Sequence, residues 1–142
     1  FASRQARDDA VAAWLRESGV ELVVLAGYMR LISPSFLAAF PRRVINVHPS
    51  LLPAFPGIGV IAQALDYGAK VTGVTVHFVD EGVDTGAIIF QRAVEVGDAL
   101  DPDALHDKLR PTEHELLCEA VRRIAAGRVT VDPANERRVV VD

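Results

Sequence analysis

The segment from residue 45 to residue 57 carries the side chains best suited to chemistry. Asn46 and His48 interrupt an apolar run, and three prolines follow within nine residues of His48. If this run is a strand, side chains two positions apart lie on the same face. An amide can donate a hydrogen bond to a carbonyl oxygen, and an imidazole donates when protonated and accepts when neutral. The pair therefore suits stabilisation of negative charge on a substrate carbonyl.

A second loop, residues 80–86, is rich in carboxylates and contains two glycines. A carboxylate near an imidazole favours its charged form, and Asp84 is a candidate for that role. Taken alone, a histidine at a strand end is more often a structural cap, and Asp84 could equally be a turn residue. The amide–imidazole pair, the rigid proline loop and the acidic loop together favour a site.

The elements that must position these groups follow from hydrophobic periodicity and from Gly and Pro signals. Helices are predicted over residues 3–18, 33–40, 60–67 and 105–126, and strands over 22–26, 44–48, 74–79, 87–96 and 128–131. The first helix is expected to bury an apolar stripe formed by Ala6, Ala10, Val11, Trp14 and Leu15. Alternating strands and helices indicate an α/β fold with a largely parallel sheet, in which ligands bind beyond the carboxyl ends of the strands.

Bulk properties narrow the class of protein. Half of the 142 residues are hydrophobic and the net charge is −4, which predicts one domain over residues 1–142 and disfavours a general nucleic-acid binder. No apolar run approaches the roughly 18 residues of a membrane span. The single cysteine, Cys118, is predicted to lie in the core, excludes an internal disulfide and suits a reducing cytoplasm.

Four motifs carry a family resemblance. They are LAGYMRLISP at 25–34, NVHPSLLP at 46–53, FPG at 55–57 and HFVDEGVDTG at 77–86. Together they resemble the phosphoribosylglycinamide formyltransferases of purine synthesis, over nearly the whole chain. Methionyl-tRNA formyltransferases tend to have Arg-Gly where this sequence has Pro56-Gly57, and formyltetrahydrofolate deformylases tend to have His-His-Ser at 48–50. The sequence has the glycinamide-type residues at both places.

The resemblance implies a formyltransferase-type, Rossmann-like fold and a catalytic trio of Asn46, His48 and Asp84. The amine of glycinamide ribonucleotide would attack the formyl group of 10-formyltetrahydrofolate, without a metal. Asn46 and His48 would stabilise the oxyanion, and Asp84 would orient His48 or relay protons through water. Electrostatic help of this kind commonly contributes roughly 10²–10³ in rate.

The resemblance also implies binding residues for both substrates. One wall of the folate pocket would be Met29, Arg30, Leu31 and Ile32, and the other would be Val79, Asp80, Glu81, Gly82 and Val83, continuing to Asp84. Glu113 matches a family residue that contacts the ribonucleotide. His77, His106 and His114 are interpreted as structural, packing or surface residues. The Leu52–Pro53 bond is a candidate for cis geometry.

Three departures from the family pattern stand out. Many members have a histidine where this chain has Gly59. Pro111 lies inside a helical pattern, where it should kink or split the helix. No Gly-Ser-rich phosphate loop precedes the first helix, so roughly the family's first third is expected to be missing. Residues 22–25 would then form an edge strand that pairs with other chains and allows a homo-oligomer.

Two other functions stay open at this stage. The same fold could pass the formyl group to water, a sugar amine or aminoacyl-tRNA. A non-catalytic folate-binding module is a further alternative, and it predicts folate binding that does not depend on His48.

Overall fold

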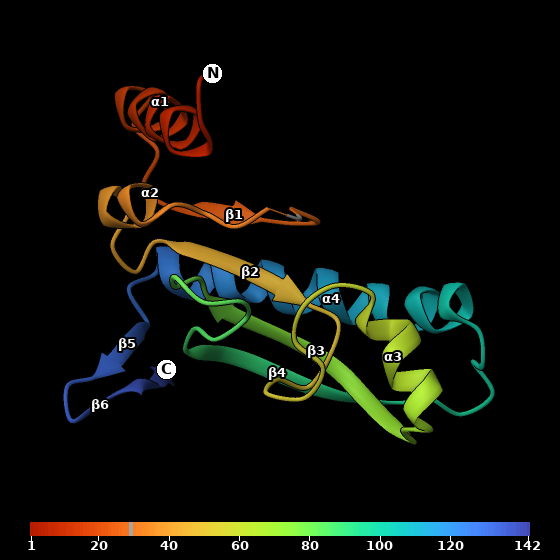
Figure 1. Cartoon of the computed structure of the whole chain (residues 1–142). Helices are drawn as coiled ribbons and strands as arrows, with labels where there is room; N and C mark the ends of the chain where they lie inside the picture. The colour runs from red at the N-terminus through yellow and green to blue at the C-terminus, as the bar shows by residue number, and fades with distance from the viewer. Residues whose placement is uncertain (29) are drawn as a thin grey trace.

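The computed structural model describes residues 1–28 and 30–142, which form one mixed sheet with helices on its flanks (Figure 1). In chain order the described elements are α1 (Arg4–Glu17), β1 (Val23–Leu25), α2 (Pro34–Ala39), β2 (Val44–His48), α3 (Val60–Tyr67), β3 (Val71–Phe78), β4 (Ile88–Glu95), α4 (Pro102–Ala125), β5 (Val129–Asp132) and β6 (Asn135–Val141). Most bounds agree with the predicted ranges to within a few residues, whereas β6 was not predicted.

The strand order is β1-β2-β3-β4-β6-β5. β1 pairs with β2 and β4 pairs with β6 in parallel, whereas β3 is antiparallel to both β2 and β4, and β5 is antiparallel to β6. Strands β1, β2, β4 and β6 therefore share one direction. The predicted α/β class and the majority strand direction are confirmed, and the reversed β3 is a feature that periodicity did not reveal.

The main core lies between the sheet and α4. Ile45 of β2 and Val74 and Val76 of β3 pack with Leu105 and Leu109 of α4, and all five are almost completely buried. Apolar residues recur on α4 at helical spacing, which explains why one face of this helix covers the sheet. Behind the sheet, α4 runs along the middle strands (Figure 1).

Pro111 does not split α4, so that part of the prediction is wrong. The helix runs unbroken from Pro102 to Ala125 with Pro111 inside it. Pro111 lies on the exposed side of α4, where water can bind the backbone carbonyl that loses its partner. The buried residues Leu109 and Leu116 hold the helix against the sheet on either side of the proline.

A second, smaller cluster joins α1, α2 and the start of β2. Its buried members are Ala12, Phe36, Phe40 and Val44, and the rings of Phe36 and Phe40 lie 5.4 Å apart. α1 contacts α2 at the far end of the molecule from β5 and β6 (Figure 1). Most of the predicted apolar stripe of α1 is not buried. Trp14 is 65% exposed, and Leu15 is the member of the stripe that packs against this cluster. The buried positions of the helix are Asp8 and Ala12.

The Leu52–Pro53 bond is cis, as predicted. Cys118 is exposed, so its predicted core position is wrong. None of the described helices combines the length and the apolar character needed to cross a membrane.

Candidate functional site

The centre of the site stands on two paired strands. In the antiparallel register of β2 and β3, Asn46 lies opposite His77 and His48 lies opposite Thr75. Directly opposed residues of such a pair share a face of the sheet, and alternation puts these four on the face turned away from α4. His48 and His77 are almost completely buried, at 4% and 2% exposure of the whole residue. The sheet therefore holds two imidazoles and one amide side by side.

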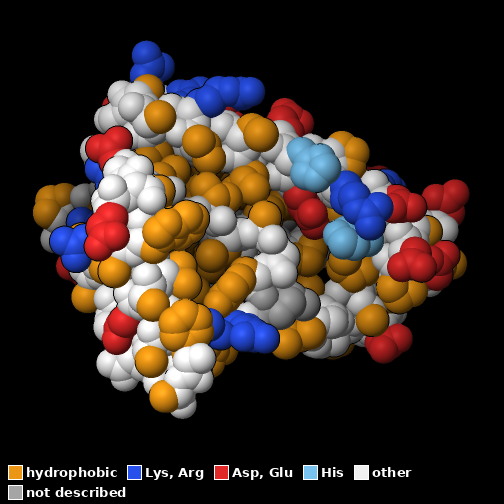
Figure 2. All heavy atoms as spheres, turned by 90° about the horizontal axis from the view of Figure 1, so that it is seen from above, with side chains coloured by type: hydrophobic (Ala, Val, Ile, Leu, Met, Phe, Trp, Pro, Cys, Tyr) orange, Lys and Arg blue, Asp and Glu red, His pale blue; other side chains and the backbone are white. Residues whose placement is uncertain are grey.

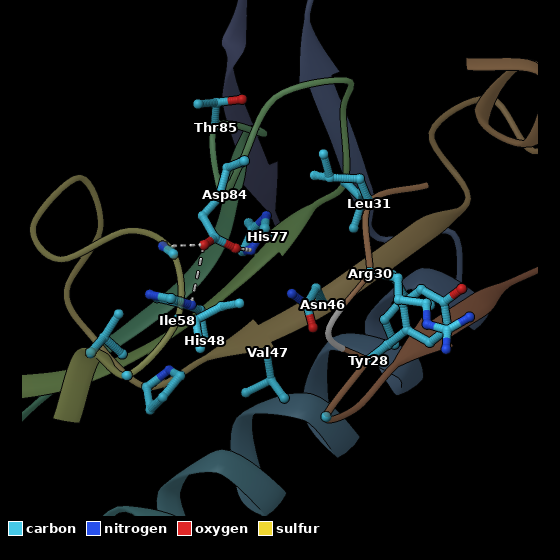
Figure 3. Close-up of a pocket in the computed structure, with 18 of the residues that line it drawn as sticks. Tyr28, Arg30, Leu31, Asn46, Val47, His48, Ile58, His77, Asp84 and Thr85 are labelled. Carbon is cyan, nitrogen blue, oxygen red and sulfur yellow. Dashed lines mark hydrogen bonds and ion pairs between the residues drawn. The ribbon is translucent and has the colours of Figure 1, made fainter. Parts of the chain in front are cut away.

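Asp84 lies between the two imidazoles. Its Oδ2 is 3.6 Å from His48 Nδ1 and its Oδ1 is 3.6 Å from His77 Nε2. The backbone N–H of Gly57 donates to Oδ2 at 2.8 Å, which ties the acidic loop to the proline loop. Figure 3 shows Asp84 directed toward both histidines, with Asn46 beside them on β2. The three predicted catalytic residues thus lie together, and His77 joins them.

The hydrogen bonds of the histidines fix where their protons lie. His48 Nε2 is 2.8 Å from the Phe55 carbonyl oxygen, and His77 Nδ1 is 2.9 Å from the Phe78 carbonyl oxygen. A carbonyl oxygen only accepts, so both of these nitrogens carry hydrogen. The nitrogen of each ring that faces Asp84 therefore carries a proton only when that ring is cationic.

His77 is held in its neutral form. Burial lowers the pKa of the His77 imidazole, and the Phe78 carbonyl and the Asp84 carboxylate oppose this shift without reversing it. Among the residues that the structure describes, the buried Nε2 atom has no hydrogen-bond partner. A buried polar atom without a partner is costly, so this nitrogen can accept a hydrogen bond from a donor at the site.

These groups line a cavity of about 540 Å³, which is in the size range of small-molecule sites. It opens beyond the carboxyl ends of β1 and β2, as α/β sheets predict. Figure 2 shows hydrophobic side chains gathered around a hollow in the middle of the face seen from above. A mainly apolar cavity with a few converging polar groups is typical of a ligand site.

The first wall of this cavity is formed by residues 27, 28 and 30–32. Leu31 and Ile32 line the cavity together with Arg30 and Tyr28. The predicted residue Met29 lies outside the described residues. Figure 3 places Leu31 across the cavity from the Asp84 group. The sequence prediction did not include Tyr28.

The second wall is residues 79–85. Of the residues predicted to form this wall of the folate pocket, Val79, Asp80, Gly82, Val83 and Asp84 line the cavity, together with Thr85, whereas Glu81 is not among the lining residues. Within this wall Asp80 Oδ1 accepts hydrogen bonds from the Gly82 N–H at 3.0 Å and from Thr85 Oγ1 at 2.6 Å. The Asp80 carboxylate therefore shapes its own loop.

A third part of the cavity comes from α4. The predicted residue Glu113 lines it, and Glu113 Oε1 lies 3.7 Å from His106 Nε2. His106 was interpreted as a surface or packing residue and instead lines the cavity beside Glu113. Residues seven apart share a helix face, and this spacing was the signal that could have linked the two. Among the described residues, no group of His, Cys, Asp and Glu side chains is arranged to hold a metal ion.

Comparisons with known proteins agree with this geometry. The pattern of the formyl transferase family matches residues 1–121. The chain is 50% identical over 129 residues to phosphoribosylglycinamide formyltransferase from Mycobacterium tuberculosis, covering 91% of this chain and 60% of the relative. It is 43% identical over 124 residues to the Bacillus subtilis protein of that name, covering 87% and 64%.

The structure of glycinamide ribonucleotide transformylase 1 from Symbiobacterium toebii superposes with a TM-score of 0.94 at 48% identity. This match covers 99% of this chain and 65% of the other chain. The chain thus spans about 60% of the length of the curated relatives it matches.

Proposed function

This chain belongs to the formyl transferase family, and we propose that it transfers a formyl group from 10-formyltetrahydrofolate to the amine of glycinamide ribonucleotide. One observation carries the proposal above all. Asp84 lies between two buried imidazoles, with Asn46 beside them, in a cavity of small-molecule size. The names of the relatives support formyl transfer and glycinamide ribonucleotide as its acceptor. Residues 1–142 would act as one catalytic domain.

The proposed reaction is balanced in atoms and charge. A bond forms between the amine nitrogen of the ribonucleotide and the formyl carbon, and the bond from that carbon to the folate nitrogen breaks. The amine loses one proton and the folate nitrogen gains one, so no net proton is released. The site must therefore stabilise an oxyanion and hold a proton while it moves between two nitrogens.

Each member of the central group fits one of these tasks. Asn46 would donate toward the developing oxyanion, where fixed donors in a dry site are most effective. His48 would stabilise the oxyanion through the charge of its cationic form, because its Nε2 faces the Phe55 carbonyl and its Nδ1 faces Asp84. Asp84 would orient His48 and stabilise its cationic form. The nitrogen of His48 that faces Asp84 can take up a proton, which gives the migrating proton a resting place next to the carboxylate.

The walls supply the binding surfaces in this proposal. Folate would lie between the first wall and the second wall, against apolar side chains such as Leu31 and Val83 and the loop backbone. Met29, Arg30 and Ile32 would complete one side, and Val79, Asp80, Glu81 and Gly82 the other. Glu113 would contact the ribonucleotide from α4, where it faces the cavity beside His106.

Other partners and the location are also proposals. The acidic balance supports a role without nucleic acid, and the reaction would take place in the cytoplasm without a membrane. Strand β1 lies at one edge of the described sheet, and self-association into a homo-oligomer is part of the proposal.

The proposal is tested in the native protein that contains this sequence, with the variant His48→Ala. We expect formyl transfer to glycinamide ribonucleotide, and a loss of turnover of roughly 10²–10⁴ in the variant, the usual effect of losing a positioned acid–base group. The affinity for folate should change little. A matched control is His114→Ala, at an exposed position on α4, which should leave turnover unchanged.

The outcomes separate the alternatives. Formyl transfer to water, a sugar amine or aminoacyl-tRNA in place of the ribonucleotide would contradict the proposed acceptor. Folate binding without any transfer would indicate a binding module. Near-normal turnover of His48→Ala would remove His48 from the mechanism.

A further inference from the structure

Asp8 is a buried carboxylate in a place where the sequence predicted no functional group. It is only 3% exposed and lies on the face of α1 that packs against α2. Carboxylates are almost never buried to this degree unless they are paired. The position therefore requires partners, and those partners show what the residue holds in place.

Both oxygens of Asp8 are engaged. Oδ1 accepts from Arg7 Nε at 2.9 Å and from Arg7 Nη2 at 2.6 Å, while Oδ2 accepts the backbone N–H of Ser33 at 2.8 Å. Burial raises the pKa of the Asp8 carboxyl, but the hydrogen bonds from Arg7 and Ser33 outweigh it and the pKa is lowered. Asp8 is therefore ionised. Outside its own helix, it accepts a hydrogen bond from the backbone amide of Ser33.

Ser33 occupies a junction next to the cavity. It directly follows Ile32, the last residue of the first wall, and its Oγ caps α2 at the Phe36 N–H. The other end of the wall begins at Gly27, just after β1, whose residue Leu25 pairs with Asn46. The first wall is thus fixed at one end by the sheet and at the other end by Asp8.

The apolar cluster that joins α1 and α2 reaches both walls. Ile32 of the first wall and Val79 of the second wall pack against the same cluster, which includes Ala12 and Phe36. A shift of α1 relative to Ser33 would therefore change the position of the first wall against the second. The spacing between the walls decides how well a flat ring fits between them.

We propose that Asp8 is a positioning residue for the folate pocket: by accepting the Ser33 N–H, it holds the first wall at the distance that the ring of the folate requires. This inference rests on the proposed function for the identity of the ligand. It differs from a purely structural role, in which the Asp8–Arg7 pair would only attach α1 to α2.

The experiment compares Asp8→Ala, Asp8→Asn and a matched control in the native protein. Asn keeps an oxygen that can accept the Ser33 N–H but loses the negative charge, whereas Ala loses both. The control is Asp9→Ala, because Asp9 also links α1 to α2, through Ser35 Oγ at 2.5 Å, without touching the wall backbone. Calorimetric titration with 10-formyltetrahydrofolate, steady-state kinetics, thermal midpoints and NMR hydrogen exchange of the Ser33 amide are measured for each.

Asp8→Ala should weaken folate binding and raise the folate KM by about tenfold, as for loss of one hydrogen bond to a charged group, with kcat within about twofold. Asp8→Asn should recover most of that loss and keep the Ser33 amide protected from exchange. Asp9→Ala should leave folate affinity unchanged, whatever its thermal midpoint. If Asp8→Ala cannot be purified folded, Asp8→Asn and the Ser33 exchange rate still decide.

Two results would overturn the inference. One is a lower thermal midpoint in Asp8→Ala with unchanged folate affinity, which would leave only a structural role. The other is equal loss of affinity in Asp8→Asn and Asp8→Ala, which would assign the effect to the Arg7 charge pair. Failure of the wild-type protein to bind folate would instead contradict the proposed function, and the Ser33 exchange experiment would still test the hydrogen bond.

Discussion

The site is built in two different ways. Asn46, His48 and His77 stand on the paired strands β2 and β3, and both histidines are almost fully buried. The two walls are loops, and Leu31 and Val83 on them are about half exposed, at 48% and 49%. Backbone ladders and close packing fix the first group, whereas a few individual hydrogen bonds hold the second.

The strand residues suit catalysis, and the loop walls suit ligand binding. Groups that stabilise a transition state must already be in position, and strands provide that rigidity. Loops can adapt to a ligand, but their position then depends on hydrogen bonds from other elements. The first wall has the tie from Asp8 to Ser33, and the second has a bond from Arg137 of β6 to the Thr85 carbonyl at 2.8 Å. Substitutions on the strands should therefore alter turnover. Substitutions that remove these hydrogen bonds to the walls should alter the affinity for folate.

Among substitutions on the loops, Asp84→Asn should give the largest effect, because Asp84 belongs to the catalytic group although it lies on a loop. We expect turnover to fall by about 10²-fold, within the usual range for a positioned acid–base group, while folate affinity changes little. The amide keeps an acceptor for the Gly57 N–H. The pH–rate profile should move toward lower pH, because the charged imidazole loses a stabilising carboxylate.

Steady-state kinetics between pH 5 and 9 would measure both effects. Asp80→Asn is the informative partner, since Asp80 shapes the same loop through Gly82 and Thr85 and should raise the folate KM with little change in kcat. An unmoved pH–rate profile in Asp84→Asn would reduce Asp84 to a turn residue.

His77→Gln should change how stability depends on pH. Folding lowers the pKa of His77, so the unfolded chain binds protons more readily and the fold loses stability as the pH falls below the ordinary value of 6.5. The His77→Gln variant has no imidazole at this position, so it lacks this loss of stability at low pH. Its thermal midpoint should fall less than that of the wild type between pH 7.5 and pH 5, by a few degrees if the linkage is about 1 kcal/mol.

Thermal unfolding at the two pH values provides the measurement, and the exposed residue His114 on α4 provides the control as His114→Gln. Identical pH dependence in wild type and His77→Gln would show that the buried imidazole is not what destabilises the acidic form.

Arg137→Ala should give the smallest effect. It removes the exposed hydrogen bond from β6 to the Thr85 carbonyl, so the folate KM should rise by about two- to threefold, as expected for a net loss of about 0.5 kcal/mol, with kcat unchanged. The neighbouring Arg138→Ala is the matched control, because Arg138 pairs with Asp132 and not with the loop. An equal effect of the two variants in titration and kinetics would mean that β6 does not hold the second wall.

Several features were predictable because their signals are local. Ser3 and Ser33 cap α1 and α2, and Gly68 ends α3, as their side-chain chemistry and backbone freedom predict. Alternation on β2 correctly placed Asn46 and His48 on one face. Trp14 and Cys118 were predicted to be buried, but both are exposed. Apolar spacing shows that a helix has an apolar face, but it does not show which element packs against that face.

Patterns along the chain were enough to predict the α/β class, the bounds of most elements, the family and the grouping of Asn46, His48 and Asp84. The antiparallel direction of β3, the register that puts His77 opposite Asn46, and the contact of Asp8 with the Ser33 amide emerged from the folded chain. Capping, periodicity and turns act over a few residues. Strand register and the partner of a buried charge depend on packing between segments far apart in the chain.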